Sequence, residues 1–246
     1  MKLRLLAILL PLLLVAGCGV GQQPINVEDG SVVEGSLDTV NGPIRVGKDC
    51  EISGSVSNVN GSIQIGDQST TGSINNVNGS ITLGTGVVSG QVNTVNGSLT
   101  LGDQSRVKGN ARTVNGQIAG GAEIRIEGDL GTTNGRIRLG QGSQVDGKVS
   151  TSNGDISLKG AQAGSLETYS GSLELLEGAI VEGALTVRRP ERPPRQAPRV
   201  VIGENVQVGG PLVFEHEVKL FVHESAEIGE ITGAEAEFYT DQPPRS

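Results

Sequence analysis

Two histidines near the end of the chain are the side chains best suited to metal binding or general base catalysis. His216 and His223 lie in the stretch HEVKLFVHE, and residues 19–215 contain no histidine. The alternation of this stretch predicts a β-strand, on which residues seven apart point to opposite faces. Two ligands on opposite faces cannot bind one ion without a bend between them. We therefore expect surface or cap positions for both histidines, with no metal site and no cofactor.

Two aspartates at equivalent positions of the sequence are candidates for a second kind of cation site. Asp67 and Asp103 occupy equivalent places in the similar stretches IGDQS and LGDQS. A row of such carboxylates would supply the oxygen ligands that Ca²⁺ prefers. The equivalent places in other repeats hold unrelated residues, namely Lys48, Thr85, Ala122 and Gln141. Because no continuous acidic row results, we interpret both aspartates as solvated corner residues.

Arginine is concentrated in residues 188–199, which contain five arginines, one glutamate and four prolines. This composition is typical of an extended, polyproline-like loop. Residues 200–246 carry nine acidic and two basic side chains, so the simplest interpretation is a solvated loop near an acidic neighbour. The alternative is a loop that binds anionic glycans or lipid head groups, both of which a basic patch attracts. The arginines concerned are Arg188, Arg189, Arg192, Arg195 and Arg199.

A cysteine near the start of the chain is a candidate for covalent modification. Two basic residues precede an apolar run over residues 5–16, which is typical of a secretory signal peptide and shorter than the about 20 residues of a membrane span. The run leads into VAGC, residues 15–18, which resembles the lipobox of bacterial lipoproteins. The resemblance implies cleavage before Cys18, lipidation of that cysteine and, with Gly19 next, sorting to the outer membrane. A plain signal peptide cleaved elsewhere, leaving a free cysteine, is the alternative.

The processed chain is expected to be strongly acidic. Without residues 1–17 it would carry 17 Lys and Arg against 27 Asp and Glu, a net charge of −10. This balance argues against nucleic acid as a partner, since nucleic acid is bound through basic surfaces. Cys50 is the one other cysteine, so no intramolecular disulfide is expected. We interpret Cys50 as a small residue at a loop corner.

The dominant pattern in the chain is a repeat of 18 to 19 residues that is marked by Asn-Gly. Self-similarity at so short a period predicts a solenoid, in which each unit buries its apolar face against its neighbours. The repeated asparagines are Asn41, Asn60, Asn78, Asn96, Asn115, Asn134 and Asn153.

Asn-Gly between apolar residues is also a strong signal for a β-hairpin, which would turn the chain back on itself. In a hairpin at Asn96-Gly97, Val95 would pair with Ser98 and share its face. The apolar residue after the turn is instead Leu99, which has the parity of Val95. We therefore predict that the in-and-out alternation runs through the glycine, so that Val95 and Leu99 face the same side and the chain winds onward.

Each repeat divides into three short segments that open with an aliphatic residue, which predicts an all-β fold. The expected architecture is a single-stranded parallel β-solenoid with triangular coils, stacked about 4.8 Å apart. Identical asparagines would then stack and share side-chain amide hydrogen bonds, as in cross-β ladders. Four of the five aromatic residues follow residue 200 and are expected to cap the open end of the core.

The expected organisation has five parts. They are a signal peptide (1–17), a lipidated cysteine with a short tether (18–24), the solenoid repeats (25–187), the Pro/Arg-rich loop (188–199) and a C-terminal β segment and cap (200–246).

The alternating VNGSI and GSV coils behind a lipobox resemble the bacterial β-solenoid proteins grouped as adhesins of the domain-of-unknown-function 4097 type. They are also similar to bactofilins, whose triangular coils polymerise end to end. The export signal and the aromatic C-terminal segment depart from the bactofilin pattern. The stretch LGDQSRVKGNA resembles hexapeptide-repeat acyltransferases, whose coil histidine acts as general base, but residues 19–215 lack a histidine.

We therefore expect a non-enzymatic, lipid-anchored protein of the bacterial cell envelope, at the outer membrane, with a structural or adhesive role. Repeated Asn, Ser and Thr faces would add weak contacts through multivalency. The alternative is a scaffold that assembles itself through the solenoid ends. The expected partners are the membrane, through the lipid, and a glycan, a lipid head group, a protein or a second copy of the chain.

Overall fold

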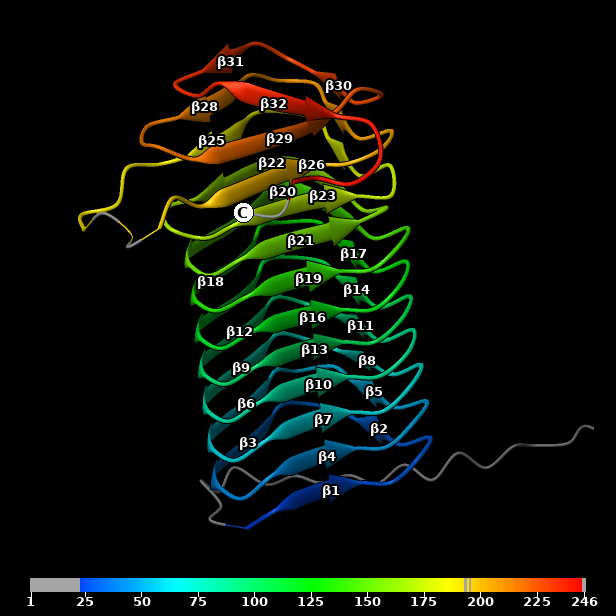
Figure 1. Ribbon diagram of the computed structural model, residues 1–246. Coiled ribbons are helices and arrows are strands. Elements are labelled where there is room, and N and C mark those ends of the chain that lie inside the picture. Colours follow the sequence, from blue (N-terminus) through cyan, green and yellow to red (C-terminus); the bar gives the residue numbers. More distant parts are fainter. Residues whose placement is uncertain (1–22, 193, 195, 245–246) are drawn as a thin grey trace, which may run out of the picture.

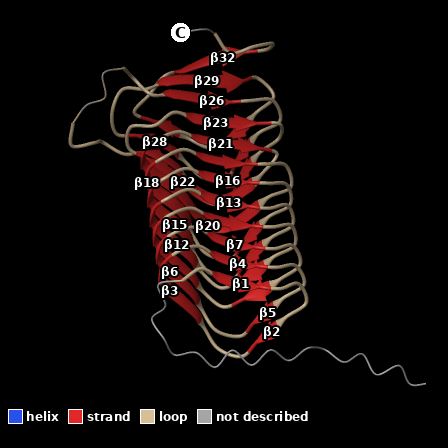
Figure 2. Ribbon diagram, turned by 90° about the horizontal axis from the view of Figure 1, so that it is seen from below, coloured by secondary structure: helices blue, strands red, loops and turns tan. Residues whose placement is uncertain are grey.

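The computed structural model describes residues 23–192, 194 and 196–244, and all regular secondary structure within them is β-strand. The chain climbs as one parallel β-solenoid of about 11 turns, with three short strands in a turn (Figures 1 and 2). Strands pair in parallel with the equivalent strands of the neighbouring turns. The predicted all-β solenoid and its onward winding are therefore confirmed, and the chain forms no hairpin at Asn-Gly.

The first face of the solenoid is a 12-stranded sheet at the front of Figure 1. Its strands are β1 (Ile25–Val27), β4 (Ile44–Val46), β7 (Ile63–Ile65), β10 (Ile81–Leu83), β13 (Leu99–Leu101), β16 (Ile118–Gly120), β19 (Ile137–Leu139), β21 (Ile156–Lys159), β23 (Leu173–Leu176), β26 (Arg199–Ile202), β29 (Lys219–His223) and β32 (Ala236–Tyr239).

The second and third faces belong to one 20-stranded sheet. The second face holds β2 (Val32–Val33), β5 (Glu51–Ile52), β8 (Thr70–Thr71), β11 (Val88–Ser89), β14 (Arg106–Val107), β17 (Arg125–Ile126), β24 (Ile180–Val181), β27 (Gln207–Val208) and β30 (Glu227–Ile228). The third face holds β3 (Leu37–Asn41), β6 (Val56–Asn60), β9 (Ile74–Asn78), β12 (Val92–Asn96), β15 (Ala111–Asn115), β18 (Leu130–Asn134), β25 (Leu185–Val187), β28 (Leu212–Phe214) and β31 (Ile231–Thr232). Two longer strands, β20 (Gln144–Asn153) and β22 (Gln162–Thr168), run through both faces.

A column of aliphatic side chains fills the axis of the coil. Ile81, Leu99 and Ile118 lie in register on the first face, and none is more than 1% exposed. The same alternation buries the two ends of strands such as β10 and β13 and exposes their middle residue. Burying one such side chain contributes about 1.5–3 kcal/mol, so this column is a main source of stability. Regular register also places the outward side chains in columns, which is what positions any surface site.

The winding continues beyond residue 187. Strand β26 pairs in parallel with β23, β29 with β26 and β32 with β29. Residues 200–239 therefore form the last turns of the same coil. The described residues between β25 and β26, which are 188–192, 194 and 196–198, lie outside the coil, at the corner where earlier turns have Asn-Gly (Figure 1).

The C-terminal aromatic side chains occupy three environments. Phe214 is 4% exposed and belongs to the main core. Phe221 and Tyr239 pack in a separate cluster on the outside of the first face. Phe238 lies in register with buried Val222 in the last strand and is 60% exposed. Of the four, Phe238 alone stands over the end of the axis.

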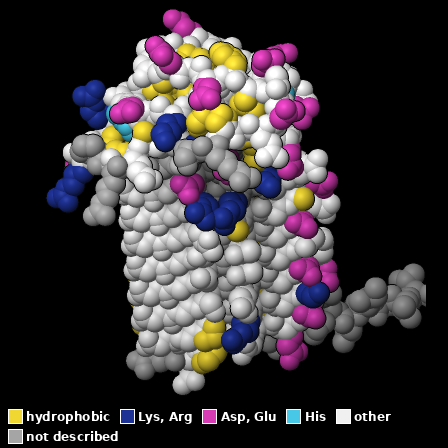
Figure 3. Space-filling model, viewed as in Figure 1, with side chains coloured by type: hydrophobic (Ala, Val, Ile, Leu, Met, Phe, Trp, Pro, Cys, Tyr) yellow, Lys and Arg dark blue, Asp and Glu magenta, His cyan; other side chains and the backbone are white. Residues whose placement is uncertain are grey.

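Both ends of the solenoid are acidic. The strand order of the first face ends at β1 and at β32, so neither strand has a partner beyond it among the described residues. The first turn, residues 25–41, carries four acidic side chains and no Lys or Arg. Residues 224–244 carry six acidic side chains and again no Lys or Arg. Acidic side chains gather over the last turns in Figure 3.

Candidate functional site

Seven asparagines, one from each of seven turns, form a single column at the corner between the third and first faces. Each side-chain amide Nδ2 donates to the Oδ1 atom of the asparagine one turn earlier, at 3.2 Å for the first step and 2.8–2.9 Å for the others. All seven side chains are exposed. This asparagine ladder consists of Asn41, Asn60, Asn78, Asn96, Asn115, Asn134 and Asn153. It presents a continuous row of amide groups to solvent.

A second polar column lies behind the asparagine ladder, inside the coil. Thr113 is 4% exposed, and its hydroxyl donates to the carbonyl oxygen of Gly97 at 2.8 Å. Five other turns repeat this bond with Asn58, Asn76, Thr94, Thr132 or Thr151 as the donor. Buried backbone carbonyls need such partners. The column therefore holds each Asn-Gly corner, and with it the ladder, in place.

The valines that precede four of the ladder asparagines point outward, and the predicted alternation through the glycine was wrong at this position. Val95 is 40% exposed, whereas Thr94 is 4% exposed and Leu99 is fully buried. The polar side chain takes the inward place because it bonds the corner carbonyl. Thr94 and Leu99 both point inward although they are five residues apart, so the strict in-and-out alternation is interrupted at the corner between them. The exposed valines form a stripe beside the ladder, made of Val59, Val77, Val95 and Val114.

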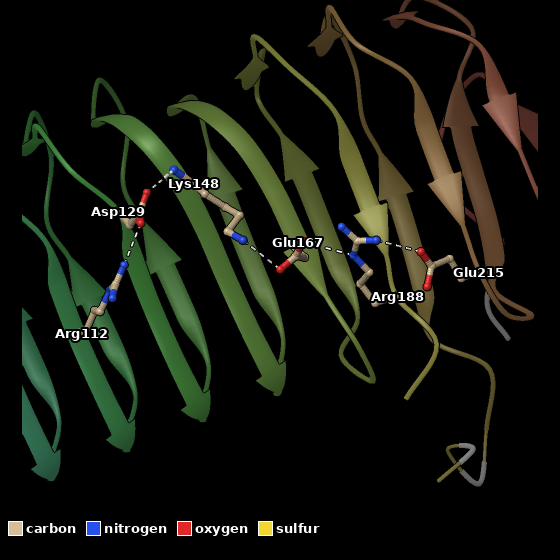
Figure 4. Close-up of polar contacts among 6 residues, drawn as sticks. All are labelled: Arg112, Asp129, Lys148, Glu167, Arg188 and Glu215. Carbon is tan, nitrogen blue, oxygen red and sulfur yellow. Dashed lines mark hydrogen bonds and ion pairs between the residues drawn. The ribbon is translucent and has the colours of Figure 1, made fainter. Parts of the chain in front are cut away.

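Two arginines at the start of the Pro/Arg-rich loop are bound by the protein itself. The Arg188 guanidinium lies between two carboxylates, with Nε 3.3 Å from Glu167 Oε2 and Nη1 3.0 Å from Glu215 Oε1 (Figure 4). The Arg189 backbone N–H donates to Glu215 Oε2 at 3.0 Å, and its Nε donates to the Glu215 carbonyl oxygen at 3.1 Å. Both arginines are thus bonded to Glu215, and Arg188 is bonded to Glu167 as well.

The other three arginines of the loop do not share these contacts. Arg192 is exposed and makes no hydrogen bond or ion pair within the described residues. Arg195 lies outside them. Arg199 begins β26, where its guanidinium lies 5.0 Å from the centre of the Phe221 ring and donates to the Pro244 carbonyl oxygen at 3.1 Å. The structure therefore does not gather the described arginines into one group.

A row of charged side chains crosses the third face from turn to turn (Figure 4). Arg112 pairs with Asp129 at 2.7 Å, and Lys148 Nζ pairs with Glu167 Oε1 at 2.9 Å. Asp129 also accepts a hydrogen bond from the Lys148 backbone N–H at 3.0 Å. Burial opposes the ionisation of Glu167, but hydrogen bonds and charges from Lys148 and Arg188 outweigh it and lower the pKa of this carboxyl. The row ties successive turns together.

A hollow on the outside of the first face brings three arginines together. This arginine hollow is lined by Arg136, Arg138, Asp155, Ser157, Ser172, Glu174 and Arg199. Sequence reasoning missed it, because Arg199 follows a long excursion and was assigned to the loop. The strand register, which aligns Arg138 with Ser157 and Ser157 with Glu174, is the signal that could have found it.

The two histidines bond to their own neighbourhoods. His216 Nε2 lies 2.9 Å from the Tyr169 carbonyl oxygen. The His223 ring lies 2.8 Å from the Ser225 hydroxyl and 2.7 Å from the Thr240 carbonyl oxygen. Within the part of the chain that the structure describes, no three side chains of the metal-ligating types form a group that could hold an ion.

The two aspartates of the IGDQS and LGDQS stretches hold the backbone of the following turn. Asp67 Oδ1 accepts from the Thr85 backbone N–H at 3.1 Å, and Asp103 Oδ1 accepts from the Ala122 N–H at 2.9 Å. Asp67 also pairs with Lys48 at 2.8 Å. The bonds from Lys48 and Thr85 lower the pKa of Asp67. Both aspartates therefore act as corner residues.

The predicted lipidation residue, Cys18, lies outside the described residues. Cys50 is 2% exposed, and its Sγ lies 3.1 Å from the Glu28 carbonyl oxygen, in a corner column of mostly small residues. The described chain starts at Gln23, whose carbonyl oxygen accepts a hydrogen bond from the Thr39 hydroxyl at 3.1 Å. No helix within residues 23–244, as far as they are described, is long and apolar enough to cross a membrane.

No protein-family model, curated protein or solved structure matches the chain. The class of protein is therefore defined by its architecture, a parallel β-solenoid with outward columns of polar side chains.

Proposed function

We propose that this protein is a non-enzymatic, lipid-anchored module of the bacterial cell envelope, held at the outer membrane, with a structural or adhesive role. The observation that carries the proposal is the short distance along the chain between two features. The lipobox-like VAGC ends at Cys18, and the first strand of the described coil, β1, begins seven residues later, at Ile25. An anchor at Cys18 would therefore hold the first turn of the solenoid close to the bilayer.

The dimensions of the coil support a role at a distance from the membrane. Buried acyl methylenes contribute about 0.8 kcal/mol each, so two or more chains on Cys18 would hold the protein stably. Turns stack about 4.8 Å apart, so about 11 turns form a body roughly 50 Å long. A body of this length can carry its outward columns well beyond the lipid head groups.

The surface of the coil supports binding through many weak contacts. The asparagine ladder offers the same amide group once in each turn, at the spacing of the coil, and it is exposed along its whole length. A partner with its own repeat can meet several of these groups at once, and linked weak contacts multiply in affinity.

A self-assembling scaffold is the second candidate, and the open strand edges of β1 and β32 favour it. Half-buried apolar side chains such as Ile25 in β1 and Ile231 in β31 would be covered by another copy. The acidic first and last turns oppose it, because like charges would meet at each junction. We therefore rank the anchored monomeric module first.

The test of the proposal is the chemistry of the mature N-terminus. The full chain is expressed in a bacterium with an outer membrane, and its N-terminal peptide is isolated from the membrane fraction for mass spectrometry. We expect a peptide that begins at Cys18 and carries acyl groups. The variant Cys18→Ser should lose both acylation and membrane retention, and the matched variant Cys50→Ser should keep them. An unmodified peptide cleaved at another position would refute the anchor.

A further inference from the structure

The arginine hollow is a basic site in an acidic protein. The whole chain has a formal net charge of −8, but the hollow combines three guanidinium groups with two carboxylates. In Figure 3, Lys and Arg side chains gather on the first face at about the level of β19. Acidic side chains lie above this level, and a broad surface of uncharged side chains lies below it. A small anion approaching this face would therefore be attracted to the hollow.

Two of the three arginines are held in place before any ligand binds. Arg136 donates from Nε and Nη2 to Asp155 Oδ2, at 3.1 and 3.0 Å. The Arg199 guanidinium stacks over Phe221 and donates to the Pro244 carbonyl oxygen. Ordering long side chains on binding costs free energy, so donors that are already ordered bind more tightly.

The third arginine has its hydrogen-bonding groups available. Arg138 is exposed and makes no hydrogen bond or ion pair with any residue that the structure describes. A guanidinium presents its N–H donors as a planar fork, which matches a carboxylate in a bidentate pair. The side chain is therefore suited to bind one carboxylate from outside the protein.

The acidic members of the hollow select among anions. Asp155 and Glu174 lie in the same hollow, and both would repel a phosphate that carries two charges. Carboxylate oxygens accept hydrogen bonds from hydroxyl groups, and the hydroxyls of Ser157 and Ser172 can donate or accept. We propose that the arginine hollow binds an acidic sugar of the uronic acid class, whose carboxylate pairs with Arg138 and whose hydroxyls bond the neighbouring acidic and serine side chains.

A longer acidic glycan could continue along the first face. The outward column leading to Arg138 contains no charge for four turns and consists of Gln64, Thr82, Thr100 and Ala119, in register. These side chains leave an uncharged surface along the first face. This inference names a ligand class for the proposed surface-binding role and rests on that role.

The test is calorimetric titration of the full chain, purified in detergent micelles, with trigalacturonate and separately with inorganic phosphate. We expect trigalacturonate to bind and phosphate to bind more weakly. Arg138→Gln should weaken trigalacturonate about tenfold, the loss expected for one charge-assisted pair. The matched control is Arg45→Gln, since Arg45 is an exposed arginine of the same outward column with no partner in the described residues. This control should bind like the unsubstituted chain.

A third variant tests the selection between anions. Glu174→Gln removes one carboxylate from the hollow and should raise the affinity for phosphate relative to trigalacturonate. The inference is overturned if trigalacturonate does not bind, if Arg138→Gln and Arg45→Gln bind it equally, or if phosphate binds as tightly. Acylation of Cys18 is measured on the same preparation. An acylated chain that fails to bind the sugar refutes the site alone, whereas sugar binding by an unacylated chain refutes the anchor alone.

Discussion

At the scale of single residues, the Asn-Gly corner combines three requirements. The asparagine bonds its equivalents in the neighbouring turns, and the buried threonine two residues earlier bonds a corner carbonyl. The glycine is required because successive backbones approach closely. A Cβ atom on Gly116 would lie 2.0 Å from the Gly97 carbonyl oxygen, the same oxygen that Thr113 bonds.

Substitution of this glycine should therefore be costly. We expect Gly116→Ala to lower the free energy of unfolding by about 1–3 kcal/mol, as for other overpacked sites, because two backbones must move apart. The matched control is Gly131→Ala, whose Cβ atom would meet the side-chain hydroxyl of Ser150 at 3.2 Å, which can rotate away, and no backbone atom closer than 3.5 Å. This control should be neutral or slightly stabilising, because alanine restricts the unfolded chain. Urea unfolding measures both, and equal losses in the two variants would contradict the close-approach account.

The position of the ladder could be predicted from sequence alone, but its buried support could not. Parallel stacking places equal residues of successive repeats above one another, which is enough to predict that Asn96 meets Asn78 and Asn115. Apolar periodicity, however, assumes that the inward residue is apolar. It therefore assigned Val95 to the inside, where the need to bond a buried carbonyl places Thr94 instead.

At the scale of elements, neighbouring strands are joined by ion pairs as well as by backbone hydrogen bonds. Lys148 lies in β20, Glu167 in β22 and Arg188 just after β25, so the row crosses three successive turns (Figure 4). These side chains are partly exposed, and exposed pairs contribute little individually. Glu167 is the most buried member, with 18% of its side chain exposed, and is bonded on both sides.

The lowered pKa of Glu167 makes the stability of this region depend on pH. The carboxyl has a usual pKa of 4.5, and its pKa is lower in the folded chain, so the unfolded chain binds the proton more readily. The stabilising contribution is complete above about pH 4.5 and is lost as the pH falls through the folded pKa. We expect the midpoint of thermal unfolding to fall less between pH 6 and pH 3 in Glu167→Gln than in the unsubstituted chain.

The matched control for this pH dependence is Glu51→Gln. Glu51 likewise lies on a strand, β5, but it is exposed, and its carboxylate makes no ion pair within the described residues. Its replacement should leave the pH dependence unchanged. An equal response of the two variants would mean that the charged row does not couple to folding.

The β-strands and their parallel pairing could be predicted from the sequence, because a two-residue alternation that repeats at a constant period is compatible with few other folds. The contacts of the arginines did not follow. From the sequence, Arg199 was assigned to the end of the Pro/Arg-rich loop. In the structure, β26 begins at Arg199 and pairs with β29, and the Arg199 guanidinium lies over the Phe221 ring. To place Arg199 correctly, one must know at which residue the strand pairing resumes after the loop. The repeat pattern does not give this residue, because the loop has no counterpart in the other turns.

At the scale of the whole molecule, the solenoid has one continuous aliphatic core and two acidic ends. The continuous core means that each turn is stabilised mainly by its neighbours, as in other repeat architectures. The acidic ends mean that two copies approaching end to end repel each other over roughly 10 Å at 0.1 M salt. Open strand edges alone would allow growth, so we expect the charge at the ends to decide between a single module and a polymer.

The most direct test is small-angle X-ray scattering with sedimentation on the full chain carrying Cys18→Ser, over a concentration series at low salt. The account predicts a monomeric rod roughly 50 Å long, with three-faced coils stacked about 4.8 Å apart, and no change with concentration. Rods of constant cross-section that lengthen with concentration would contradict it and would place the self-assembling scaffold first.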